Sequence, residues 1–193
     1  MLSSIRTTCT FFTILLAILT LTAGSARAQT AAEPNTLTVT PFLSGSFGVS
    51  QSLDNSLGIG FALGYDLTSN LGFEFELGHV FDVVGDDDNL DWSLTNYSGN
   101  VLYYFNRVPR VLPYATFGIG WERSNLDFEV IDPAALELTI PSSTEIAWNV
   151  GGGAKMELND RLIARADIRR FQVNDIAPDQ WRAYAGLTFF VKR

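Results

Sequence analysis

Few side chains in this sequence are of types that carry out catalysis. His79 is the only histidine and Cys9 the only cysteine, and most nucleophile–base pairs and transition-metal sites need one of these residue types. His79 with Ser93 or Ser98 offers a histidine–serine pair for hydrolysis, but no His-x-Ser spacing supports it. We therefore expect no catalytic set, no transition-metal site and no bound cofactor.

An acidic run at residues 86–91, Asp-Asp-Asp-Asn-Leu-Asp, carries hard oxygen ligands of the kind that calcium and magnesium prefer. It departs from the EF-hand loop because Leu90 occupies the third ligand position and glycine is absent at the sixth. A solvated acidic loop, or one bridged to an anionic surface through divalent ions, is favoured over a dedicated metal site.

The remaining charged side chains follow a pattern of alternation. Along 161–171, for example, leucine, alanine and isoleucine alternate with arginine and aspartate, so the two sets lie on opposite faces of a strand. Glycine mixes with both signs of charge on the polar face, which fits the inside of a narrow barrel, where space is tight. Acids and bases would have to pair there, because burying one charge alone costs several kcal/mol. The predicted interior charge network is Glu74, Glu76, Glu122, Glu145, Lys155, Glu157, Arg165, Asp167, Arg169 and Arg182.

The apolar and polar faces must lie on long strands. We expect strands near 37–49, 57–67, 71–82, 93–105, 111–123, 144–157, 161–171 and 181–192. Most have about ten residues, the length that crosses a bilayer when tilted. Short turns at 68–70, 106–110 and 158–160 alternate with longer or more acidic connections, an asymmetry typical of outer-membrane barrels. The prediction is an all-β fold, a transmembrane up-and-down antiparallel β-barrel of about eight strands.

Aromatic residues favour a membrane barrel over a soluble one. Amphipathic rings prefer the boundary between bilayer and water, and the four tryptophans fall near the strand ends that adjoin the long loops. Two further rings lie toward the opposite rim. The predicted interface residues are Trp92, Trp121, Trp148, Trp181, Tyr103 and Phe105. A soluble barrel with an apolar interior and a charged exterior remains the alternative.

Residues 1–28 have the order of a secretory signal peptide. Arg6 precedes a short apolar run at 11–21, and Ala26-Arg27-Ala28 forms an A-x-A cleavage site. Residues 29–193 would then be one β-barrel domain. Removal of Arg6 and Arg27 with the signal takes the formal net charge from −8 to −10, and this balance argues against nucleic acid as a partner, because phosphates require a basic surface.

Four segments carry a family resemblance: 113–120, 148–154, 159–169 and 184–190. With them the chain resembles the small eight-stranded outer-membrane barrels of the outer membrane protein A and X type. The resemblance implies a place in the outer membrane of a Gram-negative bacterium, contact with its lipid and lipopolysaccharide, and insertion by its dedicated machinery. The last strand of this family usually ends in an aromatic residue, whereas this chain ends Val191-Lys192-Arg193.

The function expected from the resemblance is a structural or surface-interaction role without catalysis, with loop 124–143 as the main contact for a partner. Two alternatives stay open. One is a narrow porin-like channel for small solutes or ions. The other is a lipid-modifying enzyme, because some barrels of this kind act on lipid A with a histidine–serine–acid group, although His79 in contact with water or lipid headgroups is the simpler interpretation.

Overall fold

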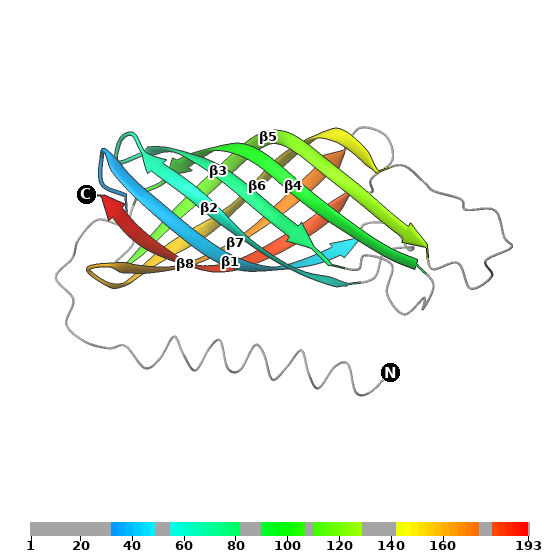
Figure 1. Cartoon of the computed structure of the whole chain (residues 1–193). Helices are drawn as coiled ribbons and strands as arrows, with labels where there is room; N and C mark the ends of the chain where they lie inside the picture. The colour runs from blue at the N-terminus through cyan, green and yellow to red at the C-terminus, as the bar shows by residue number, and fades with distance from the viewer. Residues whose placement is uncertain are drawn as a thin grey trace, which may run out of the picture.

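The chain forms a closed barrel of eight antiparallel strands (Figure 1). The computed structural model describes residues 32–48, 55–81, 90–106, 110–128, 142–173 and 179–192. The strands are β1 (Thr36–Gly48), β2 (Ser56–Asp66), β3 (Leu71–Val80), β4 (Leu90–Tyr104), β5 (Val111–Phe128), β6 (Ser143–Asn159), β7 (Leu162–Val173) and β8 (Gln180–Lys192). Each strand pairs with its sequence neighbours and β8 closes onto β1. The predicted fold class is confirmed.

Closure removes the free edges that an open sheet would expose to lipid, because every strand has a hydrogen-bonded neighbour on both sides. No helix in the described ranges is long and apolar enough to cross a membrane. The predicted signal peptide, residues 1–28, lies outside the described residues.

The connections alternate in length between the two ends of the barrel. At one end, here called the turn end, β2–β3, β4–β5 and β6–β7 are joined by short turns, and β1 begins and β8 ends there. In the β2–β3 turn the Thr68 Oγ1 accepts hydrogen bonds from the backbone N–H groups of Asn70 and Leu71 at 3.2 and 3.0 Å. The opposite end, the loop end, carries the other four connections, of which those between β1 and β2, β3 and β4, and β5 and β6 are longer than any at the turn end.

Two strands run farther than the sequence predicts. The sequence predicts that the fifth strand ends at residue 123 and the fourth begins at 93, whereas Leu90–Leu94 pairs with Ser124–Phe128 in one continuous ladder. The assignment of Ser124–Phe128 and of Leu90 and Asp91 to loops is therefore wrong. Backbone hydrogen bonds between β4 and β5 hold this ribbon together. Its residues therefore need not alternate between apolar and polar, which is the pattern that predicts strands. Residues 86–89 and 129–141 lie outside the described residues.

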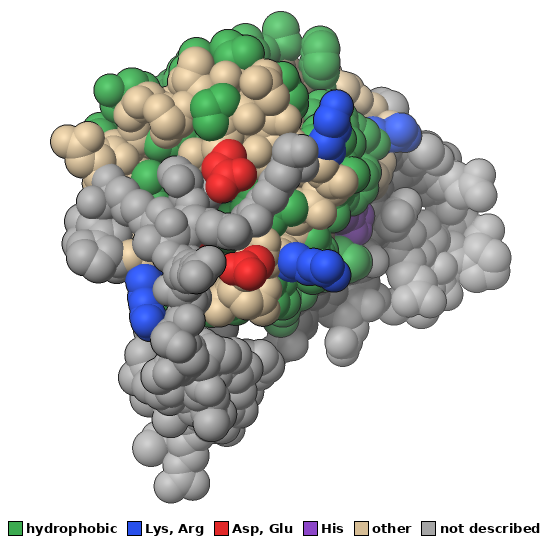
Figure 2. All heavy atoms as spheres, turned by 90° about the vertical axis from the view of Figure 1, so that its left-hand side faces the viewer, with side chains coloured by type: hydrophobic (Ala, Val, Ile, Leu, Met, Phe, Trp, Pro, Cys, Tyr) green, Lys and Arg blue, Asp and Glu red, His purple; other side chains and the backbone are tan. Residues whose placement is uncertain are grey.

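Alternate residues of each strand face opposite environments. The outward residues are apolar and exposed, as with Leu57 at 76%, Leu43 at 63% and Trp121 at 59%, whereas Glu76 and Arg169 face inward and are 1% exposed. Figure 2, seen from the turn end, shows hydrophobic side chains over the flank of the barrel. This distribution is the reverse of a soluble barrel, so the soluble alternative is excluded.

Candidate functional site

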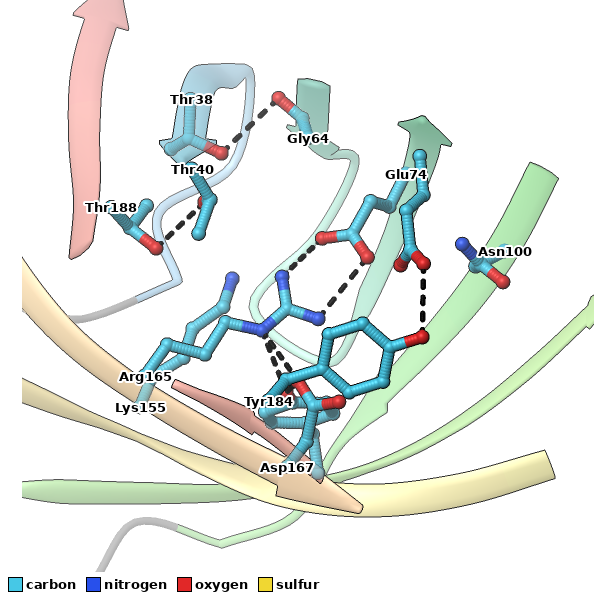
Figure 3. A network of polar contacts seen from close by, with 12 residues as sticks. Thr38, Thr40, Gly64, Glu74, Asn100, Lys155, Arg165, Asp167, Tyr184 and Thr188 are labelled. Atoms are coloured by element: carbon cyan, nitrogen blue, oxygen red, sulfur yellow. Dashed lines mark hydrogen bonds and ion pairs between the residues drawn. The ribbon is translucent and has the colours of Figure 1, made fainter. Parts of the chain in front are cut away.

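The barrel interior is centred on an ion network between β3 and β7 (Figure 3). Arg165 holds both carboxylate oxygens of Glu74, one of them at 3.1 Å, and its Nε donates to Asp167 at 2.9 Å. Arg169 contacts Asp167 at 2.9 Å, Glu76 at 2.7 Å and Glu74 at 3.2 Å. All five side chains are buried. Each charge thus has an opposite charge within reach, which the cost of burying an ion requires.

Local sequence explains why these groups meet. Glu74 and Glu76 occupy successive inward positions of β3, and β7 presents arginine, aspartate and arginine in the same way. On β6 the inward positions opposite Arg169 and Asp167 are Gly151 and Gly153. A Cβ at Gly153 would lie 2.3 Å from the Cβ of Asp167, so glycine leaves the room that the network occupies.

Aromatic rings join the charges into a continuous stack. The Tyr104 hydroxyl donates to Asp66 at 2.6 Å, and the Lys155 Nζ donates to that hydroxyl at 2.7 Å. Lys155 also lies 4.6 Å from the centre of the Tyr104 ring, within the range of cation–π attraction. The same arrangement of a carboxylate, a tyrosine hydroxyl and a cation over the ring recurs twice, with Asp167, Tyr114 and Arg165 and with Glu76, Tyr184 and Arg169.

Toward the loop end a second ion pair fills the interior. Arg182 donates to Glu122, and its guanidinium lies 4.2 Å from the centre of the Phe171 ring. The Gln180 Nε2 donates to the other oxygen of Glu122 at 3.1 Å. Both oxygens of this buried carboxylate are therefore bonded.

Toward the turn end a cluster of apolar side chains packs beside the Asp66–Lys155 pair. The residues that pack there are Ala32, Leu102, Tyr104, Leu112, Tyr114 and Ile163, with Phe190 against them. Ala32 precedes β1, is 1% exposed and packs in this cluster, so its side chain lies in the mouth of the barrel. Asn35 makes this turn with a φ of 62°, and its backbone N–H donates to the Asp66 carbonyl at 2.7 Å.

A small cavity remains between the ion network and the β1 side of the barrel. Its lining includes Thr40, Phe42, Glu76, Arg169 and Tyr184, and its volume is about 10 Å³. This is room for about one water molecule. From the turn end to the loop end, the side chains of the described residues thus fill the barrel with apolar groups beside the Asp66–Lys155 pair, then the ion network, and then the Glu122–Arg182 pair.

Eight of the ten residues of the predicted network are buried inside the barrel with a partner of opposite charge: Glu74, Glu76, Glu122, Lys155, Arg165, Asp167, Arg169 and Arg182. Glu145 and Glu157 are half-buried at inward positions near the two ends of β6. Sequence reasoning missed Asp66, Tyr104, Tyr114 and Tyr184 as members. All four share the alternation of the charged residues, which was the signal available.

The predicted interface aromatics divide between the two ends. Tyr103 and Phe105 are exposed near the turn end, with ring centres 5.4 Å apart. Trp148 and Trp181 are partly exposed in the loop-end halves of β6 and β8. Trp121 is exposed but lies seven residues before the end of β5, because that strand continues to Phe128. The Trp92 side chain lies outside what the structure describes.

His79 does not meet a serine. It faces outward, and its Nδ1 lies 2.9 Å from the Thr95 Oγ1 on β4. Ser98 lies on the inward face and is 2% exposed, whereas Ser93 is half-buried two residues beyond Thr95. Among the described residues, no group of three or more His, Cys, Asp or Glu side chains is arranged to hold a metal ion. The acidic run at 86–91 falls largely outside those residues.

The family follows from comparison of the whole chain with known proteins. The family model described as outer membrane protein beta-barrel domain matches residues 14–189. The chain belongs to this family. Its place is the bacterial outer membrane, in agreement with the apolar outer surface of the barrel. Among curated protein sequences, none matches this chain.

Solved structures share the fold at low sequence identity. Neisserial surface protein A has a TM-score of 0.61 and 16% identity, over 80% of this chain and 95% of that one. The N-terminal β-barrel domain of OprF from Pseudomonas aeruginosa has a TM-score of 0.56 and 19% identity, over 81% and 98%. Ail, the attachment invasion locus protein of Yersinia pestis, has a TM-score of 0.53 and 15% identity, over 80% and 97%.

Proposed function

We propose that this outer-membrane barrel acts through its exposed surface, as a structural and surface-interaction protein that neither catalyses a reaction nor passes solutes. The observation that carries the proposal is the filled interior. Apolar side chains occupy the turn-end mouth, and the Arg165 and Arg169 network spans the barrel from β7 to β3. A solute would have to separate buried ion pairs to pass, at a cost of several kcal/mol.

The loop end offers a structure suited to a partner. The β4–β5 ladder continues to Leu90↔Phe128, whereas the described β5–β6 ladder ends at Ser124↔Ser143 and the β3–β4 ladder at Val80↔Leu94. Within the described residues, a two-stranded ribbon thus extends beyond its neighbours, and β4 and β5 reach farthest in Figure 1. A strand edge without a neighbour can add a strand from a partner through backbone hydrogen bonds.

The proposed contact surface is this ribbon, Leu90–Leu94 with Ser124–Phe128, together with the loop that follows it. The structure of Ail in complex with the heparin analogue sucrose octasulfate supports the idea that a barrel of this size binds surface ligands. Outer-membrane lipid, including lipopolysaccharide, would surround the flank, and the insertion machinery would assemble the barrel.

The test removes the loop and keeps the barrel. Residues 132–141 are deleted, and a control replaces them with glycine and serine at equal length. We expect both variants to insert and to change their mobility on boiling in detergent, whereas bacteria that express them attach to immobilised proteins less than bacteria with the full chain. Undiminished attachment, or attachment by the full chain no greater than by cells without it, contradicts the proposal.

Two measurements address the other functions. In planar bilayers the folded barrel should be silent across voltages, and steady single-channel steps would instead support a narrow channel. His79→Ala should leave the lipid composition of the outer membrane unchanged, because Thr95 rather than a serine contacts the ring. Loss of a lipid product in that variant would indicate an enzyme.

A further inference from the structure

A polar row borders the apolar flank of the barrel on four neighbouring strands. The strand register places His79 of β3 beside Thr95 of β4, Thr95 beside Arg123 of β5, and Arg123 beside Thr144 of β6. All four residues occupy outward-facing positions of their strands. The next outward row toward the turn end consists of Leu77, Tyr97, Trp121 and Ile146. The surface thus changes from apolar to polar within one row.

Arg123 supplies this row with a positive charge. It is exposed, and its guanidinium donates to the Asn125 Oδ1 at 3.2 Å and to the Ser142 Oγ at 3.3 Å. Both acceptors are neutral, and among the described residues no carboxylate contacts it. The acidic positions on this face of the ribbon, Asp91 and Asp127, lie four residues farther along β4 and β5, roughly 13 Å away at the usual rise of a strand.

A second outward arginine shows the contrast. Arg170 on β7 lies 3.1 Å from Asp179, which neutralises it, and Gln172 donates to the same carboxylate. The chain as a whole carries a formal net charge of −8. Among the described residues of the loop-end half, Arg123 is thus an exposed cation without a carboxylate partner, at the boundary of the apolar surface of an acidic protein.

We propose that this face binds the phosphate of a glycolipid of the outer leaflet, of the lipid A type. The Arg123 guanidinium donates to the phosphate, and such charge-assisted bonds are the strongest that a side chain makes to it. The hydroxyls of Thr95 and Thr144, on either side, donate to further oxygens of the headgroup. The acyl chains lie along the exposed Tyr97 and Trp121, the apolar row directly below.

The loop end is the correct end for this lipid, because the long loops of an outer-membrane barrel face the exterior. The site lies on the flank of the barrel and needs neither loop 132–141 nor the edges of the ribbon. It is therefore independent of the proposed attachment role, and the two fail in separate experiments.

The test measures binding of lipid A to the folded barrel in detergent, by native mass spectrometry and by titration. Arg123→Gln should weaken binding about fivefold, the contribution typical of one arginine at an anionic lipid surface. The double variant Thr95→Val with Thr144→Val should weaken it as well. Arg161→Gln changes an exposed arginine in the β6–β7 turn, at the opposite end of the barrel, and should bind as the unchanged protein does.

Four results would overturn the site. Arg123→Gln could bind lipid A like the unchanged protein, or Arg161→Gln could lose as much. Phosphatidylglycerol could bind as tightly as lipid A, which would remove the assignment to a glycolipid. Excess inorganic phosphate could displace lipid A completely, which would show a site for the free anion. Altered mobility on boiling checks that each variant is folded.

Discussion

Replacement of Arg169 by methionine tests the ion network most severely. The guanidinium contacts Asp167, Glu76 and Glu74 at 2.9, 2.7 and 3.2 Å and is 1% exposed. Methionine has a similar length but no charge, so three buried carboxylates lose a shared cation. Breaking a buried ion pair by removal of one partner costs about 3–5 kcal/mol. At a slope of about 2 kcal/mol per molar urea, a loss of about 4 kcal/mol lowers the unfolding midpoint by about 2 M.

The assay is urea unfolding of the barrel refolded in lipid vesicles, followed by tryptophan fluorescence and by mobility without boiling. A second change, Glu76→Gln in the Arg169→Met variant, should restore part of the loss, because it removes one uncompensated carboxylate and keeps an acceptor for the Tyr184 hydroxyl at 3.2 Å. A midpoint for Arg169→Met equal to that of the unchanged protein would refute the reasoning. So would a greater loss in the double variant than in the single one.

Two further predictions concern packing inside the barrel. Ala32→Asp places a carboxylate among the apolar residues of the turn-end mouth and should lower the unfolding midpoint or open a measurable conductance; a variant that matches the unchanged protein in both would show that Ala32 does not close the mouth. Gly120→Val should cost about 1–3 kcal/mol, because a Cβ there would lie 1.8 Å from the backbone oxygen of Tyr97, whereas Gly99→Val faces outward with nothing within 4 Å and should be tolerated. Equal urea midpoints for the two valine variants would contradict the assignment of faces.

Alternation predicts which residues share a face, and it predicted the inward charges of β3 and β7. It does not predict which of them meet. Arg165 and Glu74 are 91 residues apart, and their contact depends on the number of strands and on how far each is displaced along its neighbour. The sequence therefore predicts that acids pair with bases inside the barrel, but it does not predict which acid contacts which base. It also does not reveal the tyrosines that connect them.

The ends of the strands were the other feature that sequence did not supply. Apolar alternation stops where the surface leaves the bilayer, so residues 124–128 resemble a loop although they pair with Leu90–Leu94. The burial of Ala32 could not be predicted either, because a single alanine before a strand gives no sign that it enters the barrel. Both features depend on contacts between segments far apart in the sequence.

The central claim is that the apolar face of each strand contacts lipid and the charged face contacts the barrel axis. Residues 29–193 contain no cysteine, so single cysteines at positions 73–78 of β3 can each carry a spin label. Labels replacing Phe73, Phe75 and Leu77 should collide freely with oxygen dissolved in the bilayer, and labels replacing Glu74 and Glu76 should not. Oxygen access at the glutamate positions, with protection at the apolar ones, would contradict the account.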